Sequence, residues 1–459
     1  MESVSTIKDL KVTVSYQQIL SIAVPITLAL LIPQINMLTN SIFLGNLSTE
    51  SLGNAGITGV YYLIFAVVGH GLNNAMQSVF SKYAGSGDSG AFKIILAQGI
   101  RISLQFAAVG ILLTWFIAPY ILQKTLAPEA FPVEMSFLKI RILGLPFLYL
   151  FQMGNAFMVA SLNSRYLIIG FISEALLNIL LDYLLIFGHA GFPAMGFNGA
   201  ALASVIAELI GFLVVLLVLY KTGLRKEYSL FKQYRFDKTK TKEIVKVAAP
   251  LIVQFVISVG TWLVFFIFIE DKGTEAKAIS NTMRNVFGLV GVFVWAFAAT
   301  SNTMVSNIIG QQRNDLVVVV ISRIMILSFL CCSMMCLIVN IFPEQFFTLF
   351  GQNNQFITDG IPVLRVVSIG LMVMSIANIW LNGVTGTGKT TVNLLIEIIA
   401  IVFYMCYTWI FMKVNYISLE VAWGNEIIYW IFVFSASFIF FKKGKWKNEI
   451  DSSASVSLR

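Results

Sequence analysis

Twelve long apolar segments limit the folds that this chain can adopt. In a helix, about 20 apolar residues cross the ~30 Å hydrocarbon core of a bilayer. The segments lie near residues 17–45, 55–80, 95–121, 133–160, 166–188, 197–220, 244–270, 281–308, 316–341, 357–384, 391–412 and 418–441. Hydrophobic residues make up 58% of the 459 positions and charged residues 12%, which is not the composition of a water-soluble protein. Because barrel strands alternate in segments of about ten residues, we predict an all-α integral membrane protein with twelve transmembrane helices.

The second half of the chain repeats the first. A shift of 225 residues places Pro25, within IAVP, on Pro250, within VAAP, and Ser81 on Ser306. Six apolar segments lie on each side of the midpoint, which predicts two pseudo-symmetric six-helix bundles related by an axis along the membrane normal. The domain boundaries we predict are an amino-terminal lobe at 1–220, a basic linker at 221–242, a carboxy-terminal lobe at 243–441 and a tail at 442–459.

Lysine and arginine in the short loops indicate the orientation of the chain. Most of them fall on one side if both termini are cytoplasmic, as the positive-inside rule requires. The linker would then face anionic lipid, which accounts for the pI of about 9.2 without nucleic acid. We find no cleavable signal peptide before the first apolar segment. We expect a multi-pass protein of a bacterial cytoplasmic (inner) membrane, and a monomer.

Residues 383–390 read GVTGTGKT and match the phosphate-loop pattern. That pattern binds nucleotide only where a strand enters the glycine-rich turn and a helix follows. Here the stretch lies between two predicted transmembrane helices, and its repeat partner, VASLNSRY at 159–166, contains no glycine. We therefore predict no nucleotide binding, no enzymatic activity and no cofactor. A duplicated twelve-helix protein of this kind is most simply a secondary transporter, driven by an ion gradient.

Ionisable and polar groups within the spans indicate where an ion would bind, because a buried charge in a membrane is costly. The predicted helix 166–188 carries Glu174, Asn178 and Asp182 at intervals of four, and so on one face. Asn40 and Ser204 fall at a similar depth, ~8–11 Å below the outer surface at 1.5 Å of rise per residue.

One carboxylate with two amides and a hydroxyl suits a small alkali cation such as Na⁺, or a proton on Asp182. The alternative is that Asn40, Asn178, Asp182 and Ser204 only hydrogen-bond helices together. The shift is 225 residues near the start of each half and varies between 223 and 226 further along, so that Asn178, Asp182 and Asn40 correspond to Ile401, Met405 and Phe265. Any such site therefore belongs to the amino-terminal lobe.

Several stretches resemble the multidrug and toxic compound extrusion (MATE) family of cation-coupled antiporters. They are the first helices of both halves, LNILLDYLLIFG at 177–188, GFNGAALAS at 196–204 and GTGKT after the tenth helix. The resemblance implies two six-helix bundles forming a V around a central cavity, and export of organic compounds in exchange for Na⁺ or H⁺. It also implies that Asp182 and Asn178 belong to the cation site, with Ser204 where the family often has threonine.

This chain departs from the family pattern in two places. The family usually has aspartate where Asn40 stands, and an amide does not titrate. We also find no carboxylate deep in helices 7 or 10, where one subgroup has a second cation site; Glu270 and Asp271 lie at a helix end. Coupling to Na⁺ or H⁺ would then depend on Asp182, with Glu174 as a possible assistant.

For the substrate cavity we predict polar and aromatic residues within the spans, since apolar walls with a few polar groups suit amphipathic ligands. The candidates are Glu174, Gln34, Tyr149, Asn155, Trp262 and Asn378. The charged residues near mid-membrane are mostly acidic, namely Glu174, Glu208 and Glu397, whose individual roles the sequence does not determine. This acidic character favours cationic organic cargo. The alternative is a lipid-linked oligosaccharide flippase of similar architecture, which would need a cationic cavity to hold diphosphate.

Overall fold

The structure is a computed structural model that describes residues 9–233, 235–348, 354–414, 418–444 and 446–447. In that part of the chain all regular structure is helical, and twelve helical segments are long and apolar enough to cross a membrane. The predicted all-α fold with twelve spans is therefore confirmed. The predicted tail at 442–459 lies outside the described residues from 448 onward.

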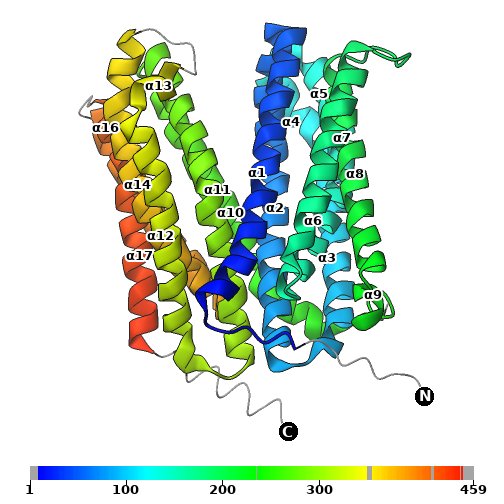
Figure 1. The fold of residues 1–459 in the computed structure, drawn as a ribbon. Coiled ribbons are helices and arrows are strands. Elements are labelled where there is room, and N and C mark those ends of the chain that lie inside the picture. The colour runs from blue at the N-terminus through cyan, green and yellow to red at the C-terminus, as the bar shows by residue number, and fades with distance from the viewer. Residues whose placement is uncertain (1–8, 234, 349–353, 415–417, 445, 448–459) are drawn as a thin grey trace. The chain divides into compact units, whose positions relative to one another are not determined.

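The chain divides into two compact units, each a bundle of long helices (Figure 1). The first unit contains residues 24–252 and the second contains residues 11–23 and those from 253 onward. The helices assigned mainly to the first unit are α1 (Tyr16–Leu47), α2 (Thr49–Ser86), α3 (Phe92–Leu112), α4 (Ala118–Thr125), α5 (Ala130–Arg141), α6 (Leu145–Ala160), α7 (Leu167–Phe187), α8 (Phe197–Lys221) and α9 (Leu224–Glu227). The third span consists of α3 and α4 joined by a π-helical turn, and the fourth consists of α5 and α6 joined by a 3-10 turn.

The second unit repeats this plan with fewer interruptions. Its helices are α10 (Lys238–Glu270), α11 (Thr274–Gly310), α12 (Val317–Ile341), α13 (Pro343–Thr348), α14 (Asn354–Gly386), α15 (Thr390–Trp409), α16 (Leu419–Ala422) and α17 (Gly424–Lys443). Its core is rich in aromatic side chains, with Trp423 fully buried against Phe265 and Phe287.

Two helices pass from one unit to the other, and both contain a proline close to the crossing point. α1 leaves the second unit between Ala23 and Val24, next to Pro25, and α10 leaves the first unit after Ile252, two residues beyond Pro250. Proline removes an intrahelical hydrogen bond and permits a bend. Each unit thus contains a short segment from the other half of the chain: residues 11–23 belong to the second unit, and residues 243–252 belong to the first. This exchange of segments differs from the lobe boundaries predicted above.

The segment just before α1 is tied to α11 and α12 of the second unit. The Val12 amide donates to Asn307 Oδ1 at 3.0 Å, and Gln311 Nε2 donates to the Val12 carbonyl at 3.0 Å. Arg323 donates to the Val14 carbonyl. These bonds account for the assignment of residues 11–23 to the second unit.

The predicted linker contributes to the first unit. Tyr228, just after α9, packs its ring against Phe92 and Phe157, with centroids 5.3 and 5.7 Å away. Tyr228 and Leu230 are both buried. The basic segment therefore has an apolar face that fixes it to the bundle.

The glycine-rich stretch at 383–390 is a turn between two helices. α14 continues through Gly386 and α15 begins at Thr390, so a helix and not a strand precedes the turn. Ser306 of α11 donates to the Gly386 carbonyl at 2.9 Å. The strand that a phosphate loop requires is replaced here by a packed helix end.

Close packing of α7 against α8 brings together the helices that carry most of the predicted cation site. At Gly199 of α8, an added Cβ would lie 2.6 Å from the Leu185 carbonyl oxygen and 2.7 Å from its carbon. The glycine thus allows the two backbones to approach closely at the level of the predicted site.

We expect Gly199→Val to destabilise the protein by about 1–3 kcal/mol, because the atoms it would meet are backbone atoms that cannot rotate away. Thermal unfolding in detergent measures the effect. Gly59→Val is the matched control, since Gly59 is exposed on α2 and nothing lies within 4 Å of an added Cβ. Equal losses for the two variants would show that the contact with Leu185 does not matter.

Candidate functional site

Asp182 is buried inside the first unit without a hydrogen-bond partner. It lies on α7, five residues before the helix ends, and its side chain is 0% exposed. Neither of its carboxylate oxygens accepts a hydrogen bond from the described part of the protein. A buried polar group normally has a partner, so this carboxyl group has unused capacity to bind a proton or a cation.

Asn178 lies one turn before Asp182 and connects α7 to α8. Its Nδ2 donates to Ser204 Oγ at 3.4 Å, and Asn178 is 2% exposed. Asn178 and Asp182 share a helix face, so the structure brings Asn178, Asp182 and Ser204 to one region between these helices.

Asn40 lies on α1, half-buried, and its Oδ1 is buried without a partner. The end of α1 meets the end of α7 through Phe43 and Phe187, whose ring centroids lie 6.0 Å apart. Asn40 is three residues before Phe43, and Asp182 five before Phe187. The contact places Asn40 near the end of α7, although Asn40 and Asp182 are not hydrogen-bonded to each other.

The oxygens present fit a proton or a small hard cation better than a transition metal. The unpartnered atoms are the two carboxylate oxygens of Asp182 and the amide oxygen of Asn40, which with the Ser204 hydroxyl form an all-oxygen set of the kind that alkali cations bind. Elsewhere in the described chain there is no group of three or more His, Cys, Asp or Glu placed to hold a metal ion.

A buried ion pair occupies the same bundle. Arg141, the last residue of α5, donates to Glu208 of α8 through two bonds of 2.6 and 2.9 Å. Tyr62 of α2 donates to Glu208 Oε1 at 3.1 Å, and the guanidinium lies 3.7 Å from the Tyr62 ring centroid. A side chain at Gly144 would meet Glu208 Oε2 at 2.0 Å, so that glycine leaves room for the pair.

Arg141 is the functional candidate that sequence reasoning missed. Its guanidinium interacts electrostatically with Asp182 and with Glu174 besides its direct partner Glu208. Arg141 therefore interacts with three carboxyl groups, which its single guanidinium balances in part. The sequence feature that could have identified Arg141 is a charged residue within the predicted span 133–160, at a position where the second half of the chain has Val367.

The residues predicted for the substrate cavity in the first unit differ in their surroundings. Tyr149 is buried and donates to the Phe65 carbonyl at 2.7 Å. Asn155 is 7% exposed and its Oδ1 has no partner among the described residues. Gln34 and Glu174 are half-buried. Tyr149 thus has a structural bond, whereas Asn155 keeps free hydrogen-bonding capacity.

The two remaining cavity candidates, Trp262 and Asn378, belong to the second unit. Trp262 is half-buried on α10 and packs on Phe266 with centroids 4.8 Å apart. Asn378 is 8% exposed and accepts from Asn382 Nδ2 at 2.8 Å. Their part in a substrate cavity stays a prediction.

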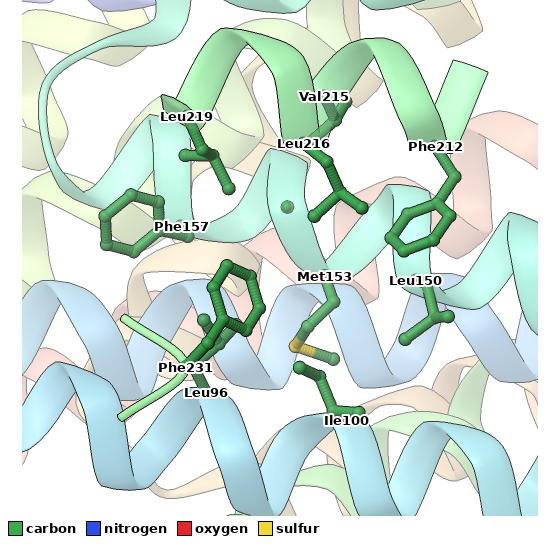
Figure 2. Close-up of a pocket in the computed structure, with 11 residues that line it drawn as sticks. Leu96, Ile100, Leu150, Met153, Phe157, Phe212, Val215, Leu216, Leu219 and Phe231 are labelled. Carbon is green, nitrogen blue, oxygen red and sulfur yellow. The ribbon is translucent and has the colours of Figure 1, made fainter. Parts of the chain in front are cut away.

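An apolar cavity of about 120 Å³ lies elsewhere in the first unit (Figure 2). Figure 2 shows side chains of α3, α6 and α8 around it, among them Met153 and Leu216, with Phe231 from the linker at one side. Its lining contains none of the predicted site residues and no polar side chain. It cannot serve as an ion site.

Fold and site together define an integral membrane protein of two repeated helical units with a polar cluster in the first. The MatE family model matches residues 25–184 and again 250–410. The two matches begin at Pro25 and Pro250, the positions that the internal repeat aligns. The chain belongs to the MatE family, and the predicted family resemblance is confirmed.

Named relatives and solved structures agree with this assignment. A probable multidrug resistance protein NorM of Thermotoga maritima is 25% identical over 414 residues, covering 89% of this chain and 88% of the relative. Another, of a Synechocystis species, is 22% identical over 364 residues, 78% of each chain. A crystal structure of a MATE protein in complex with MaL6 has the same fold, with a TM-score of 0.86 at 16% identity, covering 98% of this chain and all of that chain.

The contrast between Asp182 and the ion pair predicts opposite effects of removing a charge. Asp182→Asn should leave thermal stability unchanged or raise it, because the carboxylate has no partner to lose. Arg141→Met should cost about 3–5 kcal/mol, because it leaves Glu208 buried without its counter-charge. Arg141→Met combined with Glu208→Leu should recover most of that loss, as measured by unfolding in detergent. A similar loss in Asp182→Asn and Arg141→Met would mean that Asp182 has a partner.

Proposed function

We propose that this protein is a cation-coupled antiporter that exports amphipathic, preferentially cationic organic compounds by alternating access. The observation that carries the proposal is the buried and unpartnered carboxyl group of Asp182. Membership of the MatE family supports transport, and the names of the relatives, multidrug resistance proteins, support organic compounds as cargo. The further proposals are that the chain is not an enzyme and acts as a monomer without a cofactor.

The coupling role of Asp182 follows from the cost of its charge. An isolated carboxylate in a low-dielectric interior is unfavourable, and the guanidinium of Arg141 is already bound to Glu208. Binding of Na⁺ or H⁺ neutralises the group. Ion and cargo then bias one conformational equilibrium, and each changes the affinity for the other by the same factor.

Asn40 distinguishes this site from one with two carboxylates. An amide offers an oxygen to a cation but cannot take up a proton. With Na⁺, Asn40, Asn178 and Ser204 would supply neutral oxygens beside Asp182. With H⁺, only Asp182 in this set would change its protonation. The choice of ion therefore decides whether Asn40 takes part.

A cationic cargo is favoured by the acidic excess in the first unit, where Glu174 and Asp182 are not matched by a second cation within the described cluster. The alternative flippase would need free guanidinium or ammonium groups for a diphosphate. Arg141, the buried cation of this bundle, is held in two bonds by Glu208. We therefore propose that the cargo is an organic compound rather than a lipid-linked diphosphate. We further propose that the protein lies in a bacterial inner membrane with both termini in the cytoplasm.

Imposed gradients identify the coupling ion. Protein reconstituted in vesicles should accumulate a cationic dye in response to one of two imposed gradients, Na⁺ or H⁺. The other gradient should have no effect. With Na⁺ as the ion, Asn40→Leu should weaken the Na⁺ response. With H⁺ as the ion, Asn40→Leu should leave transport nearly unchanged. Dye movement that ignores both gradients would contradict the proposed coupling.

We expect Asp182→Asn to lose gradient-driven export, with a fall of roughly 5- to 150-fold, the range of a typical coupling free energy. Dye binding to the purified variant should persist, because Glu174 still supplies an acidic group to a cationic cargo. Asp359→Asn on α14 is the matched control, since Asp359 is exposed and accepts from Gln355 at 2.9 Å. Undiminished export by Asp182→Asn would refute the role of this residue.

A further inference from the structure

A second buried carboxyl group lies in the second unit, on α15. Glu397 is 1% exposed. Its Oε1 accepts from Ser258 of α10 and Tyr429 of α17, and its Oε2 accepts from Gln254 Nε2 of α10 at 3.3 Å. Three donors from two neighbouring helices thus surround one carboxyl group.

The charges of the surrounding helices do not balance Glu397. α15 has no other charged residue, and the charged residues of α14 are Asp359 and Arg365, both exposed and nearer the other end of that helix. The part of α10 in the second unit has only Glu270, three turns beyond Ser258. In the described chain, Glu397 has no ion pair with a lysine, arginine or histidine.

The remaining titratable neighbours are acidic or phenolic. α17 carries Glu426, which is 5% exposed and accepts from Trp430 at 3.2 Å and Tyr404 at 3.4 Å, and two lysines at its far end. Tyr429 interacts electrostatically with both Glu397 and Glu426. Glu397 therefore has hydrogen-bond donors but no counter-charge, so neutralising it requires a cation or a proton.

Gln254 indicates whether Glu397 is neutralised by a cation or by a proton. Its side chain is 8% exposed and directed at Glu397, yet its Oε1 has no partner. A protonated carboxylic acid needs one acceptor in addition to its donors. If the amide turns over, its oxygen takes the place of its nitrogen and accepts from the new O–H on Oε2. Gln254 can thus serve both the carboxylate and the acid.

We propose that Glu397, with Gln254, Ser258 and Tyr429, is a proton-binding site of the second unit. The proton comes from water and binds to Oε2, with no other bond formed or broken. Two of the three donors to the carboxylate lie on α10, one and two turns beyond Pro250, where the helix can bend. Movement of α10 away from α15 removes those donors and favours the acid, so proton uptake follows the position of α10.

Infrared spectroscopy of the full chain in lipid tests this site without transport, and so independently of Asp182. The C=O stretch of a buried carboxylic acid should appear as pH is lowered, and Glu397→Gln should remove it. Asp182→Asn and the exposed control Asp359→Asn should keep it, and Glu426→Gln identifies any band of the neighbouring acid. Absence of a band that depends on Glu397 would overturn the proposal.

Tyr429→Phe decides the question if Glu397→Gln does not fold. Loss of one hydrogen bond to the charged form should move the midpoint of the Glu397 band to higher pH by about 1–2 pH units. Ser258→Ala should act in the same direction. An unchanged midpoint in both variants would contradict the proposal. Asp182→Asn could lose Na⁺- or H⁺-driven export and still show an unchanged Glu397 band. That result would show that the Glu397 site is independent of the proposed coupling site at Asp182.

Discussion

The cost of an unpaired charge in a membrane-spanning bundle determines how the polar residues of this protein are arranged. In the first unit, Glu208 is held by Arg141 and Tyr62, and in the second, Glu397 and Glu426 receive hydrogen bonds from tyrosine, tryptophan, serine and glutamine. Asp182, like Glu134 of α5, is an exception, because both of its oxygens are buried and without partners in the described chain. A group that costs stability in this way marks a functional site more clearly than one with satisfied bonds.

The two repeats have kept the same fold while their buried polar residues have diverged. The family model matches both halves, but Asn178 and Asp182 correspond to Ile401 and Met405, and Arg141 corresponds to Val367. Glu174 and Glu397 are equivalent positions with different surroundings: Glu174 is half-buried near Arg141 and Glu208, whereas Glu397 is fully buried among neutral donors. Packing of apolar side chains preserves the fold, and so the polar positions are free to take different roles in each unit.

Sequence patterns were sufficient for the twelve spans and the repeat, because hydropathy and a shift that stays within 223 to 226 residues depend on many positions at once. They also placed Asn178, Asp182 and Ser204 at one level, since helical periodicity fixes faces and depth. They did not give the pairing of Arg141 with Glu208, because partners on different helices depend on how α5 and α8 pack. The exchange of residues 11–23 and 243–252 was likewise missed, since hydropathy does not show which bundle a helix end contacts.

That exchange links the two halves of the chain during its synthesis. Residues 11–23 leave the ribosome early, yet Asn307 of α11 and Gln311 just after that helix, which both bind Val12, are made almost 300 residues later. The first unit in turn lacks its last segment until α10 has been translated. Neither bundle can therefore be completed in the bilayer from its own half of the gene product, and a chain cut in the basic linker would yield two fragments that each depend on the other to assemble.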